Sequence, residues 1–561
     1  MDSRNLFVDS IFTPSTSFTL TENGAKTLTS TSSSIVDQFG KAGNYRGRPL
    51  MSVFEDQAKV WEEDAELALR LPFYLRMVTR KTKISKGNAT DKVQSGQGAR
   101  DESFKRLLWI AKEKQETFYN NIWLLPVVGS WKDFWTLMFY DVKENLNVIN
   151  REVMYEIIAQ GLLNETHVDL VKKYMPRIKS NKKCTTDWTK CTNMFAKEFA
   201  KTMGISYQEY NKLKVSGKAH EFQKLMCSRR FNELKWDKIP GRALSLITST
   251  KFLERHNLVD NYTKWVIEQP VAKYTGYVFE LASKLKKAVF GDCGLYFSHN
   301  SENSNKKIPI HVKHTIDAQF NQLLAQAEAD GQIKENVWCC LDTSGSMSSL
   351  VKGLKGITCG DIADSLALFF ASLNKGAFHN KLIMFDHESY PYTMNGESFC
   401  DRYLSLPSVS CGGTNFQSAV EEIIKIRKAH PEIPLEQYPT TVLVVTDMNF
   451  DAVDRSSSYR NQPTNYEYSV QSLKSVFPSD FVDNMKFIWW DCASRYGNTQ
   501  YEGNSLTPGC HFISGFDGSI INLILGNTLV VDKDTKTVRQ MTAEEMVVKA
   551  LTQEVLNYLK V

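Results

Sequence analysis

The sequence predicts a multidomain protein in which an all-α array of helices precedes a doubly wound α/β domain. Three observations predict this order. A chain of 561 residues is too long for a single hydrophobic core. Apolar residues recur at helical spacing through most of the first half, whereas short apolar runs alternate with helical segments after about residue 331. Strands that alternate with helices imply a mostly parallel sheet covered on both faces.

The first part of the chain divides into a lead and a helical domain. Residues 1–45 are polar and rich in hydroxyl side chains, with no helical period, so we expect them to be extended or poorly ordered. From Phe54 onward the apolar spacing is helical, and residues 46–330 are therefore predicted to form an all-α domain. Helix pairs stacked as a solenoid are the expected form.

Residues 331–561 are predicted to form the α/β domain. The expected strands lie at 337–341, 381–386, 440–447, 485–491 and 511–514, and the expected helices lie at about 361–374, 416–429 and 542–558. Ligands of such folds bind at the carboxyl ends of the strands. The first and third of these strands end in Asp342 and Asp447, which directs attention to that edge of the sheet.

The most specific pattern is Asp342-x-Ser344-x-Ser346 at the end of the buried strand 337–341. Its carboxylate and two hydroxyls suit Mg²⁺ or Mn²⁺, because these hard cations prefer oxygen ligands. The Gly412-Gly413 turn can bring the Thr414 hydroxyl toward the same point. We predict direct binding of the ion by Ser344, Ser346 and Thr414, binding through water by Asp342 and Asp447, and a free position for an Asp or Glu of a protein partner. Alone, each residue could instead be a helix cap or a turn former.

These segments together resemble the von Willebrand factor A domain and its metal-ion-dependent adhesion site, with all five positions filled. The resemblance implies a Rossmann-like fold for residues 331–561. The segments 69–76, 96–104, 125–133 and 235–243, with 444–451, resemble the DUF2828 family. That arrangement is similar to the Ro 60 kDa autoantigens, whose TROVE module of HEAT-like helix pairs binds small structured RNAs and precedes a von Willebrand factor A domain. The resemblance implies a HEAT-like array for residues 46–330 and a ribonucleoprotein function, but it matches no individual RNA-contacting residue.

Charge is divided between the two halves. Residues 1–330 hold 49 Lys+Arg against 37 Asp+Glu, a net charge of +12, and residues 331–561 hold 19 against 26, a net charge of −7. Such asymmetry indicates a polyanion, here small structured or single-stranded RNA, as the partner of the first half, although a basic surface can also serve solubility. The candidate phosphate contacts lie at helix ends and joins: Arg80, Lys81, Lys83, Lys172, Lys173, Arg177, Lys179, Lys182, Lys183, Arg229 and Arg230. Trp188 or Trp236 could stack on an unpaired base, or could belong to the core.

Other functional classes find less support. Gly96-Gln97-Gly98 lacks the Lys-Ser/Thr of a P-loop, and Ser344 and Ser346 lack a nucleophile elbow, so we expect no enzyme activity. Eleven cysteines without a Cys-x-x-Cys pair fit a reduced, cytoplasmic setting, and no membrane partner is expected. The sequence predicts an RNA-binding scaffold with a Mg²⁺-dependent protein-adhesion site. The alternative is a purely protein-binding scaffold, such as an assembly or virion component.

Overall fold

The computed structural model describes residues 18–561 except 44, 46, 78–79, 83–91, 95, 217–220, 249–250, 269–273, 275, 292–307, 330–334, 408–411, 454–461, 494–499, 517–527 and 532–537. The chain divides into two compact units. The helical unit comprises Arg48–Ile239 and Leu551–Val561. The α/β unit comprises the described residues up to Gly47 together with Pro240–Ala550.

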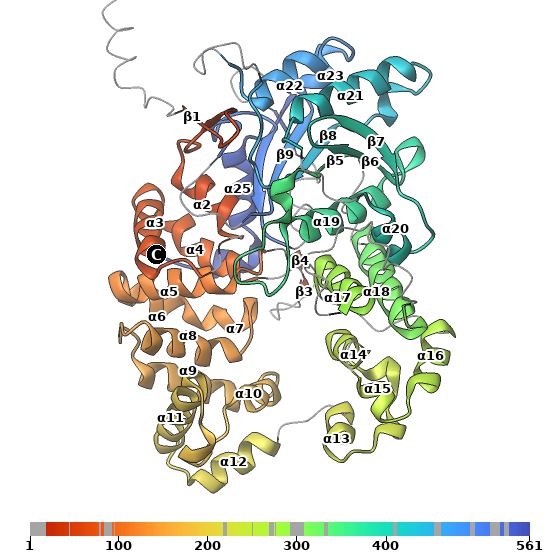
Figure 1. Ribbon diagram of the computed structural model, residues 1–561. Helices are drawn as coiled ribbons and strands as arrows, with labels where there is room; N and C mark the ends of the chain where they lie inside the picture. Colours follow the sequence, from red (N-terminus) through yellow and green to blue (C-terminus); the bar gives the residue numbers. More distant parts are fainter. Residues whose placement is uncertain are drawn as a thin grey trace, which may run out of the picture. The chain divides into compact units, whose positions relative to one another are not determined.

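The helical unit is built from α-helices joined by short loops (Figure 1). Its helices are α3 (Leu50–Glu63), α4 (Ala65–Arg76), α5 (Arg100–Glu113), α6 (Gln115–Asn121), α7 (Leu125–Val128), α8 (Lys132–Lys143), α9 (Arg151–Leu163), α10 (Val168–Tyr174), α11 (Asp187–Thr202), α12 (Tyr207–Ser216) and α13 (Glu221–Cys227). A short antiparallel pair, β3 (Arg80–Thr82) and β4 (Lys92–Gln94), interrupts them. The prediction of an all-α first half is confirmed apart from this hairpin.

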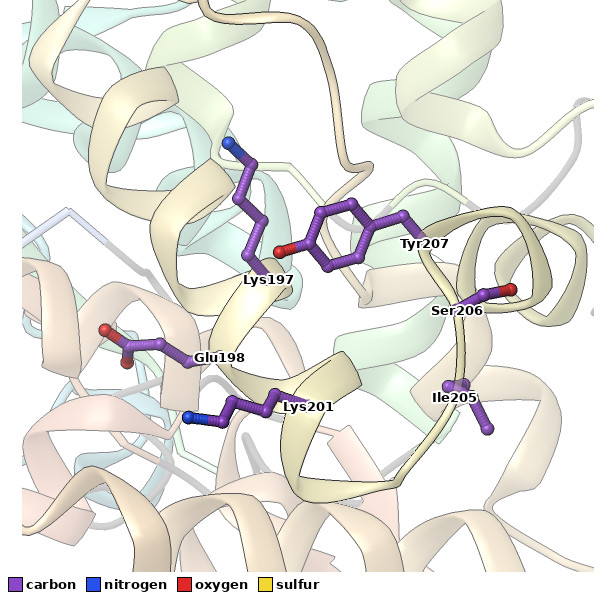
Figure 2. A pocket seen from close by; sticks show the side chains of 6 residues that line it. All are labelled: Lys197, Glu198, Lys201, Ile205, Ser206 and Tyr207. Atoms are coloured by element: carbon purple, nitrogen blue, oxygen red, sulfur yellow. The ribbon is translucent and has the colours of Figure 1, made fainter.

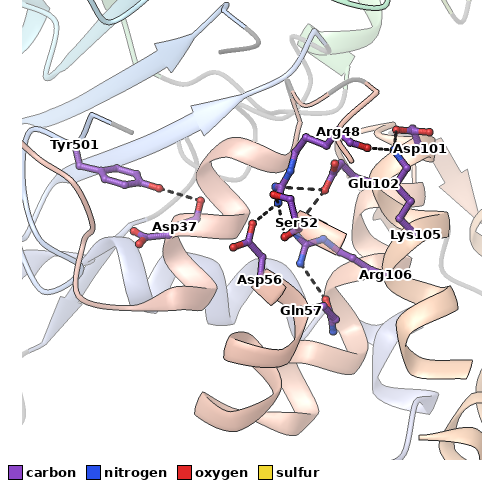
Figure 3. Close-up of polar contacts among 10 residues, drawn as sticks. All are labelled: Asp37, Arg48, Ser52, Asp56, Gln57, Asp101, Glu102, Lys105, Arg106 and Tyr501. Atoms are coloured by element: carbon purple, nitrogen blue, oxygen red, sulfur yellow. Dashed lines mark hydrogen bonds and ion pairs between the residues drawn. The ribbon is translucent and has the colours of Figure 1, made fainter. Parts of the chain in front are cut away.

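Helices α3 and α5 enclose a buried ionic network (Figure 3). The side chains of Glu102 and Arg106 are fully buried and lie 3.6 Å apart, and Arg48 approaches Glu102 at 3.8 Å. Arg48 also pairs with Asp56, and Arg106 donates a hydrogen bond of 3.0 Å to Gln57. Buried charges are stable only when paired, so this network fixes how the two helices meet.

The core of the α/β unit is a β-sheet. Among the described residues, its strands lie in the order β10-β9-β8-β5-β6-β7. The strands are β5 (Val337–Asp342), β6 (Lys381–Phe385), β7 (Ser389–Thr393), β8 (Thr441–Thr446), β9 (Lys486–Asp491) and β10 (Cys510–Ser514). All neighbours pair in parallel except β6 and β7. β5 and β8 are buried at every position, as expected of strands covered on both faces.

Helices pack on this sheet, among them α19 (Cys359–Leu373), which contacts β5 and β8, and α21 (Phe416–Ala429), which contacts β6 and β7 (Figure 1). The unit also includes α20 (Phe399–Ser405), α22 (Asn465–Leu473), α23 (Ser479–Asp483), α25 (Ala543–Leu551) and the pair β11 (Leu529–Val531) and β12 (Val538–Gln540). The prediction of a doubly wound α/β fold after the helical array is confirmed.

The unit boundaries differ from the predicted boundaries at 45 and 330. The helices α14 (Gly241–Thr248), α15 (Phe252–Arg255), α16 (Val259–Glu268), α17 (Val278–Phe290) and α18 (Ile310–Ala329) belong to the α/β unit. α17 packs on α19. The last eleven residues join the helical unit, where Asn121 exchanges two hydrogen bonds with the backbone of Lys560.

The prediction of an extended or poorly ordered lead agrees with two short strands within residues 18–42 but is wrong for the helix at the end of this segment. This segment forms β1 (Phe18–Leu20), β2 (Lys26–Leu28) and α2 (Ser34–Ala42). Leu28 pairs with Tyr501, and α2 packs against β10. Its few apolar residues gain burial only through these distant partners, which a local pattern cannot reveal. Among the described helices, none combines the length and the apolar character needed to cross a membrane.

Candidate metal and nucleic-acid sites

The two predicted carboxylates lie at the same edge of the sheet. Asp342 is the last residue of β5, and Asp447 directly follows β8. β5 and β8 are adjacent parallel strands. The chain continues from β5 to β6 and from β8 to β9, which lie on opposite sides of this pair in the strand order, so the carboxyl ends of β5 and β8 form the topological switch point. The sequence prediction of a shared location for Asp342 and Asp447 agrees with this register.

The loop after β5 brings the first three predicted ligands together. The Ser344 amide donates a 2.9 Å hydrogen bond to Asp342 Oδ1, and the Ser344 and Ser346 hydroxyl oxygens lie 3.1 Å apart. The Thr446 hydroxyl holds the other oxygen of Asp342 at 2.5 Å. These contacts orient one carboxylate and two hydroxyls around a common point.

Burial and mutual repulsion determine the electrostatics of the two carboxylates in this oxygen cluster. Asp342 and Asp447 are 2% and 4% exposed. Burial, and then repulsion by Asp447, raise the pKa of Asp342 to about 7. Two carboxylates with hydroxyl neighbours form an oxygen donor set that favours a hard divalent cation. The residues present therefore fit Mg²⁺ or Mn²⁺.

Thr414 is joined to this site through the loop that follows β8. Its amide donates a 3.1 Å hydrogen bond to Asp451 Oδ2, and its carbonyl accepts one of 2.9 Å from the Asp451 amide. A Cβ on Gly413 would lie 2.3 Å from the same Asp451 oxygen. A side chain at position 413 would therefore force Asp451 to shift, and Asp451 is a supporting residue that the sequence pattern alone did not identify.

Clusters of three or more His, Cys, Asp and Glu side chains with metal-binding geometry are absent from the described residues. The predicted site is of another kind, because three of its five donors are hydroxyl oxygens.

Trp188 forms the centre of a basic groove on the helical unit. Two adjoining cavities of about 320 and 200 Å³ share Pro176, Trp188 and Thr192. The first also contains Lys132 and Lys173, and the second contains Arg177 and Lys179. The Lys132 ammonium lies 5.6 Å from the centre of the indole, and the ring of Phe139 supports the indole edge-on at 5.1 Å. We call this surface the Trp188 groove.

The loop that supplies Arg177 and Lys179 is held in place by two asparagines. Asn193 of α11 accepts a 2.8 Å hydrogen bond from the Lys179 amide. Asn211 of α12 both accepts from and donates to the backbone of Ile178, at 3.1 Å in each case. The cations are thus presented by a fixed backbone, which lowers the entropy cost of binding a phosphate.

A second basic pocket lies at the other end of α11. It has a volume of about 520 Å³ and is lined by Lys197, Glu198, Lys201, Ile205, Ser206 and Tyr207. Figure 2 shows the Tyr207 hydroxyl directed toward Lys197, with Lys201 further along the helix. Glu198 is already bonded by Arg151 and Tyr155 at 2.9 and 2.7 Å. The sequence prediction missed this pocket, although the i, i+4 spacing of Lys197 and Lys201 places both lysines on one helix face.

The other predicted RNA contacts are dispersed. Lys182 and Lys183 are exposed in the turn before α11, and Arg229 and Arg230 are exposed after α13, where Arg230 pairs with Glu233 at 3.2 Å. Arg80 and Lys81 lie in β3, whereas Lys83 lies outside the described residues. The suggestion that Trp236 stacks on a base is wrong, because this side chain is buried and only 5% of it is exposed.

Comparisons with known proteins give a family match for the second half of the chain and a structural similarity over most of its length. Residues 336–560 match the family model of DUF7788, a domain of unknown function. This match is to a different model from the DUF2828 family that the motifs resemble. No curated protein matches the chain. Among solved structures, the chain is similar to the crystal structure of the Ro (RSR) protein of Deinococcus radiodurans, with 15% identity over 88% of this chain and 98% of that chain and a TM-score of 0.40.

Proposed function

We propose that this protein is a non-catalytic RNA-binding scaffold whose α/β unit carries a Mg²⁺-dependent protein-adhesion site. The Trp188 groove carries the RNA part of this proposal. It combines an aromatic face with cations at Lys132, Lys173, Arg177 and Lys179, the pairing that recognises an unstacked base and its flanking phosphates. Residues 170–201 hold nine Lys+Arg against two Asp+Glu, which would draw a polyanion to this surface.

The adhesion part rests on the oxygen cluster at Asp342 and Asp447. A cation bound there would supply positive charge between two acidic surfaces, and a carboxylate of the partner would complete its shell. Ser344 and Ser346 would bind the ion directly, while Asp342, held by Thr446, would act through water. One cation with hydroxyl ligands supports binding rather than phosphoester hydrolysis, which commonly uses two metals.

Calorimetry with Mg²⁺ tests the adhesion site. We expect binding by the full chain that Asp342→Ala abolishes and Ser346→Ala weakens. Asp480→Ala serves as a matched control, because Asp480 is an exposed carboxylate on α23. Equal Mg²⁺ affinity in the wild type and in Asp342→Ala would contradict the assignment.

Filter binding of single-stranded RNA tests the groove. Trp188→Ala should weaken binding by about 1–3 kcal/mol, the usual loss for one stacked base, and Trp188→Phe should lose less. Trp123→Ala is the control, since Trp123 is 43% exposed on the same unit but is not among the residues that line the groove. A wild-type chain that retains no RNA at about 50 mM salt would exclude the RNA role and favour a purely protein-binding scaffold.

A further inference from the structure

The loop that follows β8 carries one proposed metal ligand, supports a second, and contains a residue in an unfavourable backbone conformation. It begins with Asp447 and reaches Asp451, whose amide and carboxylate hold Thr414. Met448, between these positions, has a φ of 66°. A non-glycine residue in the left-handed region is disfavoured and persists only where its surroundings fix it. Something must therefore hold this loop in place.

The N-terminal turn at residues 21–24 makes contacts of this kind. Thr21 donates its hydroxyl to the Phe450 carbonyl at 2.5 Å, and Asn23 donates its side-chain amide to the Asn449 carbonyl at 2.9 Å. Gly24, with a φ of 89°, forms a β-bridge with Asp451. More than 400 residues of sequence separate the two segments.

Asn449 connects this turn to the metal-site carboxylate. Its side-chain oxygen accepts from the Glu22 amide at 3.1 Å, and its side-chain nitrogen donates to the Glu22 carboxylate at 3.2 Å. The backbone amide of Asn449 donates to Asp447 Oδ1 at 3.3 Å. Asn449 therefore contacts both the N-terminal turn and a proposed metal ligand.

The turn is itself anchored in the α/β unit. The Thr21 hydroxyl accepts from the Ala25 amide at 2.9 Å, which closes the turn. β2 continues into paired backbone hydrogen bonds between Leu28 and Tyr501, of 2.8 and 3.0 Å. The Tyr501 hydroxyl in turn donates to the Asp37 carbonyl of α2 at 3.0 Å. The turn is thus fastened to elements other than the metal-site loop.

We propose that residues 21–24, acting through Asn449 and Asp451, are positioning residues for the metal site, so that cation affinity depends on the N-terminal segment. This inference rests on the proposed adhesion site. Residues that hydrogen-bond to metal ligands commonly fix the orientation of those ligands and thereby affect metal affinity. The turn fixes Asp447 through Asn449 and Thr414 through Asp451, and so controls two of the five proposed ligands.

Mg²⁺ calorimetry of the full chain with three variants tests the proposal. Asn449→Ala removes the link to Glu22, and Thr21→Val removes the hydroxyl while keeping the side-chain shape. Each should weaken Mg²⁺ binding, by about 10–100-fold for Asn449→Ala. Thr19→Val, in β1 beside the turn, should bind as the wild type does. Unchanged affinity in both Asn449→Ala and Thr21→Val would overturn the proposal.

Linkage provides a second readout. If the turn favours cation binding, the cation must stabilise the turn by the same factor. Amide hydrogens of residues 18–28 should therefore exchange more slowly in the wild type when Mg²⁺ is added, and this protection should be absent in Asp342→Ala. Mg²⁺ binding without any protection of residues 18–28 would overturn the positioning role alone. No Mg²⁺ binding by the wild type would instead overturn the adhesion site on which the proposal rests.

Discussion

Gly413 shows how one missing methyl group can govern a functional site. An added Cβ would meet Asp451 Oδ2 at 2.3 Å, so Gly413→Ala must displace either Asp451 or the Thr414 backbone. We expect Mg²⁺ affinity to fall while the thermal unfolding temperature changes little, because the affected loop lies at the edge of the sheet. Calorimetry and a melting curve on the same sample would separate the two effects. A variant that keeps wild-type affinity would show that the Asp451 carboxylate does not set the position of Thr414.

Glu502 is predicted to make the stability of the α/β unit depend on pH. It is buried at 1% exposure and accepts a 2.8 Å hydrogen bond from the Asn465 amide. Burial raises its pKa from 4.5 to about 8. At a pH between these two pKa values, Glu502 keeps its proton in the folded chain and loses it in the unfolded chain. The resulting contribution to the free energy of unfolding is complete below the unfolded pKa and is lost as the pH rises through about 8.

Glu502→Gln removes this titration. Chemical unfolding at a series of pH values should then show a flatter loss of stability across that range, whereas Glu436→Gln, at an exposed position, should follow the wild type. A wild-type curve that rises through the same interval would contradict the buried neutral carboxyl.

At the scale of elements, we predict that the loop between α10 and α11 strengthens RNA binding because its backbone is rigid. Asn193 and Asn211 bind its backbone and carry no charge. Asn193→Ala and Asn211→Ala should therefore weaken RNA binding without changing the slope of affinity against salt, because the number of phosphate contacts remains the same. Filter binding at several salt concentrations provides the measurement. A changed slope with unchanged affinity would argue against preorganisation.

The joining of α3 to α5 depends on a buried carboxylate. Glu102→Ala would leave Arg48 and Arg106 near each other in the interior without their shared counter-ion. Removal of one partner from a buried ionic group commonly costs about 3–5 kcal/mol. Urea unfolding should show a loss of this size. Glu113→Ala, at the exposed end of the same helix, should cost less than about 1 kcal/mol.

The sequence predicts those elements whose patterns lie within the element itself. The sequence predicts a helix at 416–429, and α21 occupies those residues, because its apolar period and its Asn415 cap are both local. The strands that end at Asp342 or precede Asp447, β5 and β8, are continuous apolar runs, and the sequence predicts their ends to within one residue. The grouping of residues 18–47 and 240–329 with the sheet depends on contacts far apart in sequence.

The candidate sites divide in the same way. The five proposed metal ligands can be named from local motifs and the family resemblance. Asn449 and Asp451 become recognisable as supporting residues only once Glu22 and Thr414 are seen beside them. The sequence gives no reason to prefer Trp188 over Trp236 as the residue that stacks on a base. Only the fold leaves Trp188 part-exposed between cations and buries Trp236.

At the scale of the whole molecule, the charge asymmetry follows the compact units. The helical unit holds 35 Lys+Arg against 25 Asp+Glu, and the α/β unit holds 33 against 38. The net charges are therefore +10 and −5. The two proposed partners differ accordingly, since a polyanion suits the first unit and a carboxylate can approach the second only through a cation.

This division predicts how salt and mutation should affect the two activities. Each phosphate neutralised on a single strand contributes about −0.7 to the slope of log affinity against log salt, so about six contacts would lower RNA affinity on the order of 10²–10³-fold between about 50 and 200 mM salt. Reversal of Lys172, Lys173, Arg177 and Lys179 to Glu should weaken binding and flatten the slope by about 3. Asp342→Ala should leave both the affinity and the slope unchanged, because its carboxylate belongs to the acidic unit. An RNA affinity that falls in Asp342→Ala, in a sample that melts as the wild type does, would show that the two sites are coupled and would contradict their assignment to independent partners.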